Sequence, residues 1–371
     1  EVASRFDATG GPYLYARAAF GARVGFVTGW LLLVARLAGG AALCGLLAQY
    51  LAQYAPAVGA GAARLAAVVA TLAALTAVHV RGIQVAAAVS TGITAAKLLP
   101  LVALVVAGAF AVAPARLALG APPSAPAFGH AVLLLCFGFS GFETVVIAAG
   151  ESRDPRRDLP AALGVGLLIV ALLYVAVQAV CVGAVPQLAT AERPLAEAGR
   201  RIFGGAAVPV VVAGAVVAIV GTLHTALLAA SRLALAMADA GELPAPLARI
   251  HPRFRTPAVA LVVVACGFFL LTAISTFRGA LTVSTAARLI VYGVTCAALP
   301  ALRRRTDVAP PALRIPLAPL AWGGGLLLVV AVLTGVTGAQ ARVLVAAVAL
   351  GCVLRVVTRT RGPGDGREST A

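Results

Sequence analysis

Glu143 and four basic side chains lie inside long apolar stretches of this sequence, where a charge is costly. The basic residues are Arg36, Lys97, Arg232 and Arg288. Ionisable groups in such stretches are candidates for binding charged solutes or moving protons, unless they extend to a polar interface. We interpret Arg232 as reaching an interface. We expect Arg36 and Arg288 to bind backbone carbonyls or to line a water-filled vestibule.

Lys97 is the only lysine among the 29 lysine and arginine residues. Every other basic residue of this kind is arginine, so the lysine at position 97 indicates a property that arginine lacks. Lysine loses its proton readily when buried, whereas arginine effectively keeps it. Lys97 is therefore a candidate for a proton-linked or cation-mimicking role. The alternative is a side chain that extends to the interface.

Two glycines interrupt the apolar stretch that contains Glu143. Residues 137–143 read Phe-Gly-Phe-Ser-Gly-Phe-Glu, with glycine at 138 and 141. Glycine costs about 1 kcal/mol relative to alanine inside a helix, so we expect local unwinding here. Unwound backbone inside a bilayer presents N–H and C=O groups that bind charged solutes. The alternative is a close contact between helices through small residues.

Membrane-spanning helices are the elements that must position these groups. The chain of 371 residues is 61% hydrophobic and only 11% charged, whereas a soluble domain holds about 25% charged residues. Runs of about 20 apolar residues cross a bilayer as helices. Ten runs are predicted, over 26–50, 63–80, 86–112, 129–149, 161–183, 206–237, 257–276, 280–301, 317–338 and 341–358.

Arginines concentrate in alternate connections between these runs, and the richer set is expected to face the cytoplasm. That set includes 153–157, 249–255, 303–305 and the C-terminal end. The sequence predicts a multi-pass protein of the cell (plasma or inner) membrane, with a cytoplasmic C-terminus. We expect one transmembrane domain over 1–360 and a disordered cytoplasmic tail over 361–371.

Several classes of function are disfavoured by the composition. The net charge of +16 does not indicate nucleic-acid binding, because the basic residues form no patch with aromatic ones. The single lysine does not follow a glycine, so the phosphate-binding loop of an ATP-driven pump is missing from the sequence. The histidines and cysteines have no metal-ligand spacing, and His224 is interpreted as a hydrogen-bonded structural residue.

Motifs along most of the chain resemble those of amino acid permeases in the amino acid–polyamine–organocation superfamily. They are Gly-Gly-Pro-Tyr at 10–13, Arg-Gly at 81–82 with Lys97, Gly-Phe-Ser-Gly-Phe-Glu at 138–143, Ala-Gly-Glu at 149–151, Arg-Asp-Pro-Arg-Arg-Asp-Leu-Pro-Ala-Ala at 153–162, and Ala-Met-Ala-Asp-Ala-Gly-Glu-Leu-Pro at 236–244. The resemblance implies an all-α, LeuT-like fold of twelve helices with two inverted five-helix repeats. On that register about ten helices are present, and helix one and most of helix two are missing.

The resemblance also implies roles for individual residues. Phe137 would pack on the substrate or gate it, and residues 138–141 would bind it through backbone groups. The substrate-binding residues expected on this basis are Phe137, Gly138, Phe139, Ser140, Gly141 and Gly40. Lys97 would replace a sodium ion, and Glu143 would couple protonation or gating to movement of helix six. Gly39 and Gly40 would leave room for the substrate side chain.

The function implied is secondary active transport of amino acids or related amines by alternating access, with a proton as the coupling ion. No catalytic residue, cofactor, metal or nucleic acid is expected, and the protein is not expected to be an enzyme. A proton-independent exchanger and a solute sensor that does not transport stay open as alternatives. The phenylalanines and small residues favour an uncharged or modestly polar substrate. The sequence does not indicate the oligomeric state.

Overall fold

The computed structural model describes residues 1–118, 120–124, 127–128, 131, 135, 138–139, 141–147, 152, 154–191, 194–205, 207–334 and 338–360. Every regular element in this part of the chain is a helix. Seven helices are long and apolar enough to cross a membrane. They are α2 (Ala22–Leu51), α3 (Gly61–Val80), α4 (Ile83–Ala109), α7 (Pro155–Ala184), α9 (Ala207–Asp239), α11 (Phe277–Arg303) and α13 (Gly338–Thr360).

Two shorter apolar helices, α10 (Ala258–Ile274) and α12 (Ala318–Leu333), complete nine of the ten predicted spans. Of the remaining predicted span, 129–149, ten of the 21 residues lie outside the described residues, as does the tail at 361–371. Its described end holds the short helix α6 (Glu143–Ile147). The spans were predictable because the length and polarity of an apolar run are local properties of the sequence.

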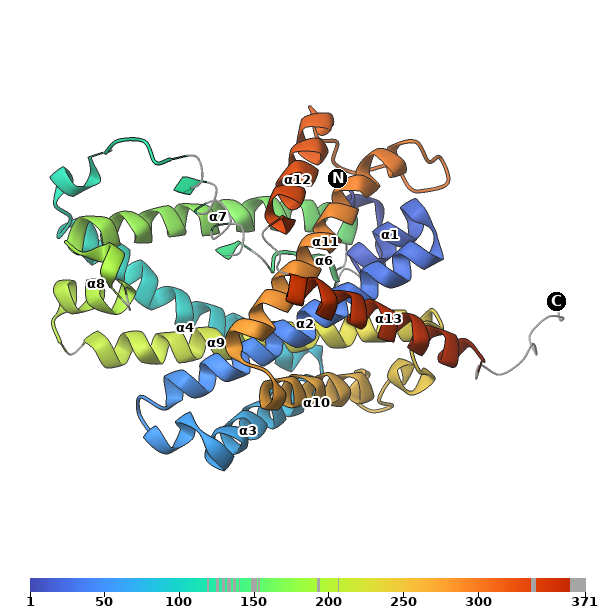
Figure 1. Ribbon diagram of the computed structural model, residues 1–371, viewed down its shortest axis with the longest axis horizontal. Coiled ribbons are helices and arrows are strands. Elements are labelled where there is room, and N and C mark those ends of the chain that lie inside the picture. The colour runs from blue at the N-terminus through green and yellow to red at the C-terminus, as the bar shows by residue number, and fades with distance from the viewer. Residues whose placement is uncertain are drawn as a thin grey trace.

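Helix α2 is the central element of the bundle. In its most apolar stretch 72% of the residues are buried, against 11% in α4, α7 and α13. Small residues allow this close packing, since side chains of neighbouring elements lie directly against Gly25, Gly29 and Gly40. Helices α4, α7 and α9 run side by side along the long axis (Figure 1). Their exposed apolar side chains are suited to contact with lipid.

Two further helices were not among the predicted spans. Helix α1 (Pro12–Phe20) packs against α2 and α11. Helix α8 (Pro194–Phe203) carries Glu197, whose carboxylate pairs with Arg200 and Arg201 on the exposed face. Both helices are too short to cross a bilayer, so they are interpreted as lying at its surfaces.

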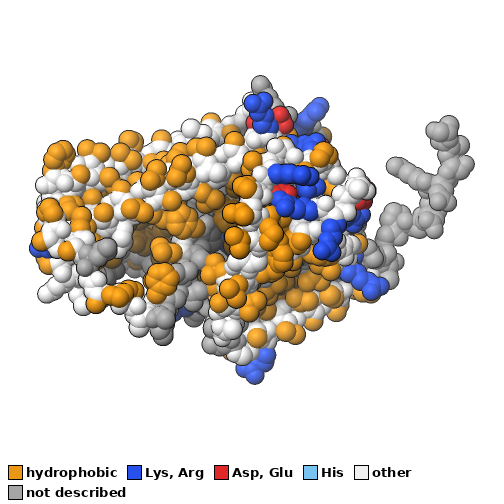
Figure 2. All heavy atoms as spheres, turned by 90° about the horizontal axis from the view of Figure 1, so that it is seen from above, with side chains coloured by type: hydrophobic (Ala, Val, Ile, Leu, Met, Phe, Trp, Pro, Cys, Tyr) orange, Lys and Arg blue, Asp and Glu red, His pale blue; other side chains and the backbone are white. Residues whose placement is uncertain are grey.

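Basic side chains gather at one end of the molecule, whereas apolar ones cover most of the remaining face that Figure 2 shows. This basic end also holds α1 and the connection between α11 and α12 (Figure 1). The arrangement is the one that the uneven arginine distribution predicts for a membrane protein.

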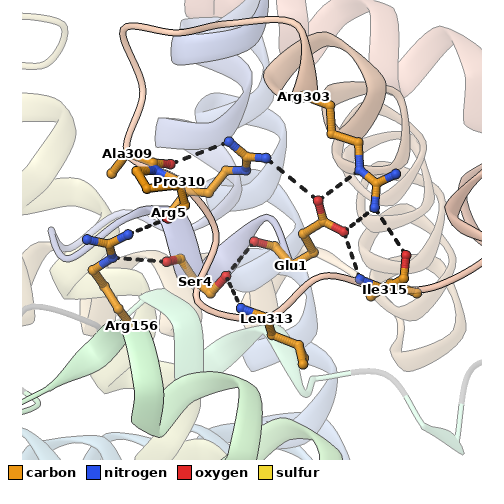
Figure 3. A network of polar contacts seen from close by, with 9 residues as sticks. All are labelled: Glu1, Ser4, Arg5, Arg156, Arg303, Ala309, Pro310, Leu313 and Ile315. Atoms are coloured by element: carbon orange, nitrogen blue, oxygen red, sulfur yellow. Dashed lines mark hydrogen bonds and ion pairs between the residues drawn. The ribbon is translucent and has the colours of Figure 1, made fainter.

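A polar network at the basic end ties the N-terminal segment to two distant parts of the chain (Figure 3). Arg303 Nη2 lies 2.6 Å from Glu1 Oε2, and the N–H of Ile315 donates to the same carboxylate at 3.0 Å. The hydrogen bond from Arg303 lowers the pKa of Glu1 to about 2. Arg156 Nε of α7 donates to the carbonyl of Ser4 at 3.2 Å. These contacts fix residues 304–317 against the start of α7.

Candidate substrate and gating site

The helix that contains Glu143 is interrupted where the sequence predicts. Phe139, Gly141 and Phe142 form turns, and α6 begins only at Glu143. Gly141 has a φ of +107°, a conformation that residues with a side chain rarely adopt. The glycine at 141 is therefore required by the shape of the interruption. Phe137 and Ser140, which were also assigned to the substrate site, lie outside the described residues.

Tyr174 of α7 contacts the first part of the interruption. Its hydroxyl donates to the carbonyl of Gly138 at 3.3 Å, and its ring lies 5.2 Å from the ring of Phe139. One freed carbonyl of the interruption is thus already satisfied by a neighbouring helix, which is how unwound backbone is tolerated at membrane depth.

Glu143 is the centre of a buried polar cluster. Only 2% of the residue is exposed, and both carboxylate oxygens have partners. Oε1 lies 2.8 Å from Arg36 Nη2 and 3.6 Å from Arg288 Nε. Oε2 accepts hydrogen bonds from the Tyr292 hydroxyl at 2.7 Å and from the Gly141 N–H at 3.0 Å. We call Glu143, Arg36, Arg288 and Tyr292 the Glu143 cluster.

The Glu143 cluster joins three elements that are distant in sequence. Arg36 comes from the middle of α2, and Arg288 and Tyr292 lie four residues apart on one face of α11. Arg36 also donates to the hydroxyl of Thr144 at 2.8 Å. A single carboxylate therefore holds the end of the interruption against α2 and α11.

Gly39 of α2 allows α2 and α11 to pack closely beside the Glu143 cluster. A Cβ at Gly39 would lie 2.9 Å from Ser284 Oγ and 3.7 Å from Arg288 Nη2. Ser284 in turn donates to the carbonyl of Ala35 at 2.7 Å. In the structure the space beside Gly39 is thus taken by α11 and its arginine.

The structure corrects the expectation for Arg36 and Arg288. We expected these side chains to bind backbone carbonyls or to line a vestibule, whereas they pair with Glu143. A sequence signal for this pairing existed. Glu143 is the only acid inside a predicted span, and charges within a membrane usually pair with one another. Tyr292, which carries no charge, gave no such signal.

Lys97 is not part of this cluster. It lies half-buried on α4, and within the described part of the chain no ion pair or hydrogen bond joins it to Glu143 or to any other group. Its predicted role in proton coupling therefore stays a prediction, and it does not depend on contact with Glu143.

The space beside Gly40 is filled by an aromatic ring. A Cβ at Gly40 would lie 2.4 Å from ring atoms of Phe268, which is fully buried on α10. In this conformation the glycine serves the packing of α2 against α10. A contact of Gly40 with substrate stays a prediction.

Replacing Gly40 with alanine is expected to destabilise the protein by about 1–3 kcal/mol, since the ring of Phe268 has to move. Thermal unfolding of the purified protein in detergent measures the change. Gly164→Ala on α7 is the matched control, because its added Cβ meets nothing within 4 Å. Equal midpoints for the two variants would contradict the packing assigned to Gly40.

His224 has the structural role expected of it. His224 Nε2 lies 3.0 Å from the carbonyl of Ala86, and His79 Nε2 lies 3.0 Å from the carbonyl of His224. The two rings stack with centroids 4.2 Å apart. These contacts join α3, α4 and α9. Among the described residues, no three His, Cys, Asp or Glu side chains come together as a metal site requires.

Comparison with known proteins decides the family. Residues 1–354 match the amino acid permease family. This chain belongs to the amino acid permease family. It is 37% identical to the uncharacterized transporter Rv1999c of Mycobacterium tuberculosis over 364 residues, which cover 96% of this chain and 80% of that transporter.

More distant relatives of this permease have names that state a substrate. The serine/threonine exchanger SteT of Bacillus subtilis is 28% identical over 270 residues, covering 70% of this chain and 61% of the exchanger. Cationic amino acid transporter 9, chloroplastic, of Arabidopsis thaliana is 33% identical over 273 residues, covering 68% of this chain and 48% of that protein. The permease is accordingly an all-helical, multi-pass membrane protein of an amino acid transporter family.

Proposed function

We propose that this permease carries an amino acid across the membrane by alternating access. The substrate binds at the interrupted helix through residues 137–141 and beside Gly40, and Glu143 acts as a gate. The observation that carries the proposal is the position of Glu143, which follows the interruption directly and joins it to α2 and α11. Movement of the interrupted helix relative to these two helices has to break those contacts, as a gate requires.

Uptake of radiolabelled amino acids by proteoliposomes that contain the full-length protein tests this function. Saturable uptake that an excess of unlabelled amino acid inhibits is the expected result. If no amino acid is taken up or exchanged, but one is bound, the protein is a solute sensor instead. The basic end is proposed to face the cytoplasm together with the C-terminus, in accord with the positive-inside rule.

A proton is the proposed coupling ion, with Lys97 as the group that binds and releases it. Lysine is chosen over arginine for this role because arginine effectively always keeps its proton in a protein. Replacing Lys97 with alanine should abolish uptake driven by a pH gradient. Replacing it with arginine keeps the charge but prevents deprotonation, so that uptake should also lose its response to the gradient. Wild-type pH dependence in either variant would refute the coupling role.

Proton-independent exchange is the second candidate. The relationship to a serine/threonine exchanger favours it. Counterflow of amino acid between preloaded vesicles and medium, with the same rate in the presence and absence of a pH gradient, would establish exchange. Net accumulation in vesicles that hold no internal amino acid would exclude it.

A further inference from the structure

The Glu143 cluster contains more positive than negative charge. Two guanidinium groups face one carboxylate, and the phenol of Tyr292 is neutral. The side chains of Arg36, Glu143 and Arg288 are only 4%, 3% and 14% exposed. Arginine keeps its proton in proteins, so one positive charge at the middle of α2 and α11 has no counter-charge within the cluster.

The carboxylate of Glu143 cannot neutralise the excess positive charge, because both of its oxygens already have partners. One of its oxygens already faces both arginines, and the other accepts from Tyr292 and Gly141. The sequence offers no second acid in a predicted span. A buried charge without a partner is strongly unfavourable in a membrane, which makes an anion from outside the chain a favourable partner.

The two arginines also have unused hydrogen-bond donors. Arg36 gives one Nη to Thr144 and the other to Glu143. The Nε groups of Arg36 and Arg288 are buried and have no hydrogen-bond partner in the part of the chain that the structure describes, although Arg288 Nε faces Glu143 Oε1 at 3.6 Å, beyond hydrogen-bond distance. A planar guanidinium with free N–H groups matches the two oxygens of a carboxylate.

The cluster lies next to the proposed substrate site. Gly141, in the interruption, donates directly to Glu143, and Gly39 places Arg288 against α2. Gly141, the last residue of the proposed substrate segment, thus contacts the same carboxylate that both arginines face.

We infer that the transported substrate is an amino acid with an acidic side chain, whose second carboxylate binds Arg36 and Arg288. The inference rests on the proposed function and names its substrate class. It differs from the uncharged or modestly polar substrate expected from the sequence, because that expectation did not place Arg36 and Arg288 beside Glu143. An acidic side chain neutralises the buried charge, a neutral one leaves it unchanged, and a cationic one doubles it. The order of affinity is therefore acidic, then neutral, then cationic.

Competition in proteoliposomes with the full-length protein tests this order. Glutamate and glutamine have nearly the same shape, so their ratio of inhibition constants isolates the charge. Glutamate should bind at least about tenfold more tightly than glutamine, which corresponds to about 1.4 kcal/mol, and lysine should bind most weakly. Equal constants for glutamate and glutamine, or tighter binding of lysine, would overturn the inference while leaving amino acid transport intact. Absence of uptake of every amino acid would refute the proposed function itself.

Variants of Arg288 test whether the Glu143 cluster causes the preference for glutamate over glutamine. Arg288→Gln should remove at least about nine-tenths of the preference for glutamate over glutamine, and Arg288→Lys should retain most of it because the charge remains. Arg278→Gln, on the same helix but exposed, should leave the ratio unchanged. An Arg288→Gln protein that still prefers glutamate as strongly as the wild type would contradict the assignment. If the Arg288→Gln protein does not fold, the Arg288→Lys protein provides the test. Loss of the preference for glutamate over glutamine in that variant would also contradict the assignment.

Discussion

Replacing Glu143 with glutamine is expected to abolish transport and to destabilise the protein by about 3–5 kcal/mol, the cost of removing one partner from a buried ion pair. The amide keeps the shape of the side chain but leaves Arg36 and Arg288 buried without a counter-charge. It also weakens the acceptor for Tyr292, at 2.7 Å. Thermal unfolding in detergent and uptake by proteoliposomes measure the two losses.

A double variant separates the ion pair from other effects of the substitution. Arg36→Gln combined with Glu143→Gln removes both members of the 2.8 Å pair. The double variant should therefore be clearly more stable than the sum of the two single losses predicts, with a coupling of about 1–3 kcal/mol for groups in contact. If the stability losses of the two single variants simply add in the double variant, the ion pair between Glu143 and Arg36 contributes nothing to stability, which would contradict this prediction.

Replacing Glu242 with glutamine is expected to have the second large effect. Glu242 is fully buried just after α9, and its Oε1 lies 3.1 Å from Arg17 Nη1 of α1 and 3.4 Å from Arg355 Nη2 of α13. The loss of stability should approach about 3 kcal/mol, the lower value for breaking a buried pair, because Arg17 is half-exposed and regains water. The connections between α1, α9 and α13 should loosen, and trypsin should cleave at Arg17 faster.

Glu197 provides the matched control for this substitution. Its carboxylate also pairs with two arginines, Arg200 and Arg201, but on the exposed face of α8. Water replaces such a pair at little cost, so Glu197→Gln should leave the unfolding temperature unchanged. Equal effects of Glu242→Gln and Glu197→Gln would contradict the burial argument.

The sequence alone determined the class of the protein and the position of its interruption. Apolar length and the spacing of Gly138 and Gly141 are each contained within a short stretch of chain, and the alternation of arginines can be read along the chain without knowing its contacts. Helix formation in a bilayer depends on such local properties, because every backbone group has to be satisfied within its own segment. The spans and the turn at Gly141 could therefore be predicted, and the motifs placed them in a family.

Only the tertiary structure decided which distant groups meet. Arg36 and Glu143 are 107 positions apart in the chain, and Tyr292 is 149 positions from Glu143. The filling of the space beside Gly40 by Phe268 likewise depends on how α2 crosses α10. Crossing angles and rotations of helices follow from the packing of many side chains at once. The sequence identified the charges within the membrane, and the packing of the helices around α2 made two of them the partners of Glu143.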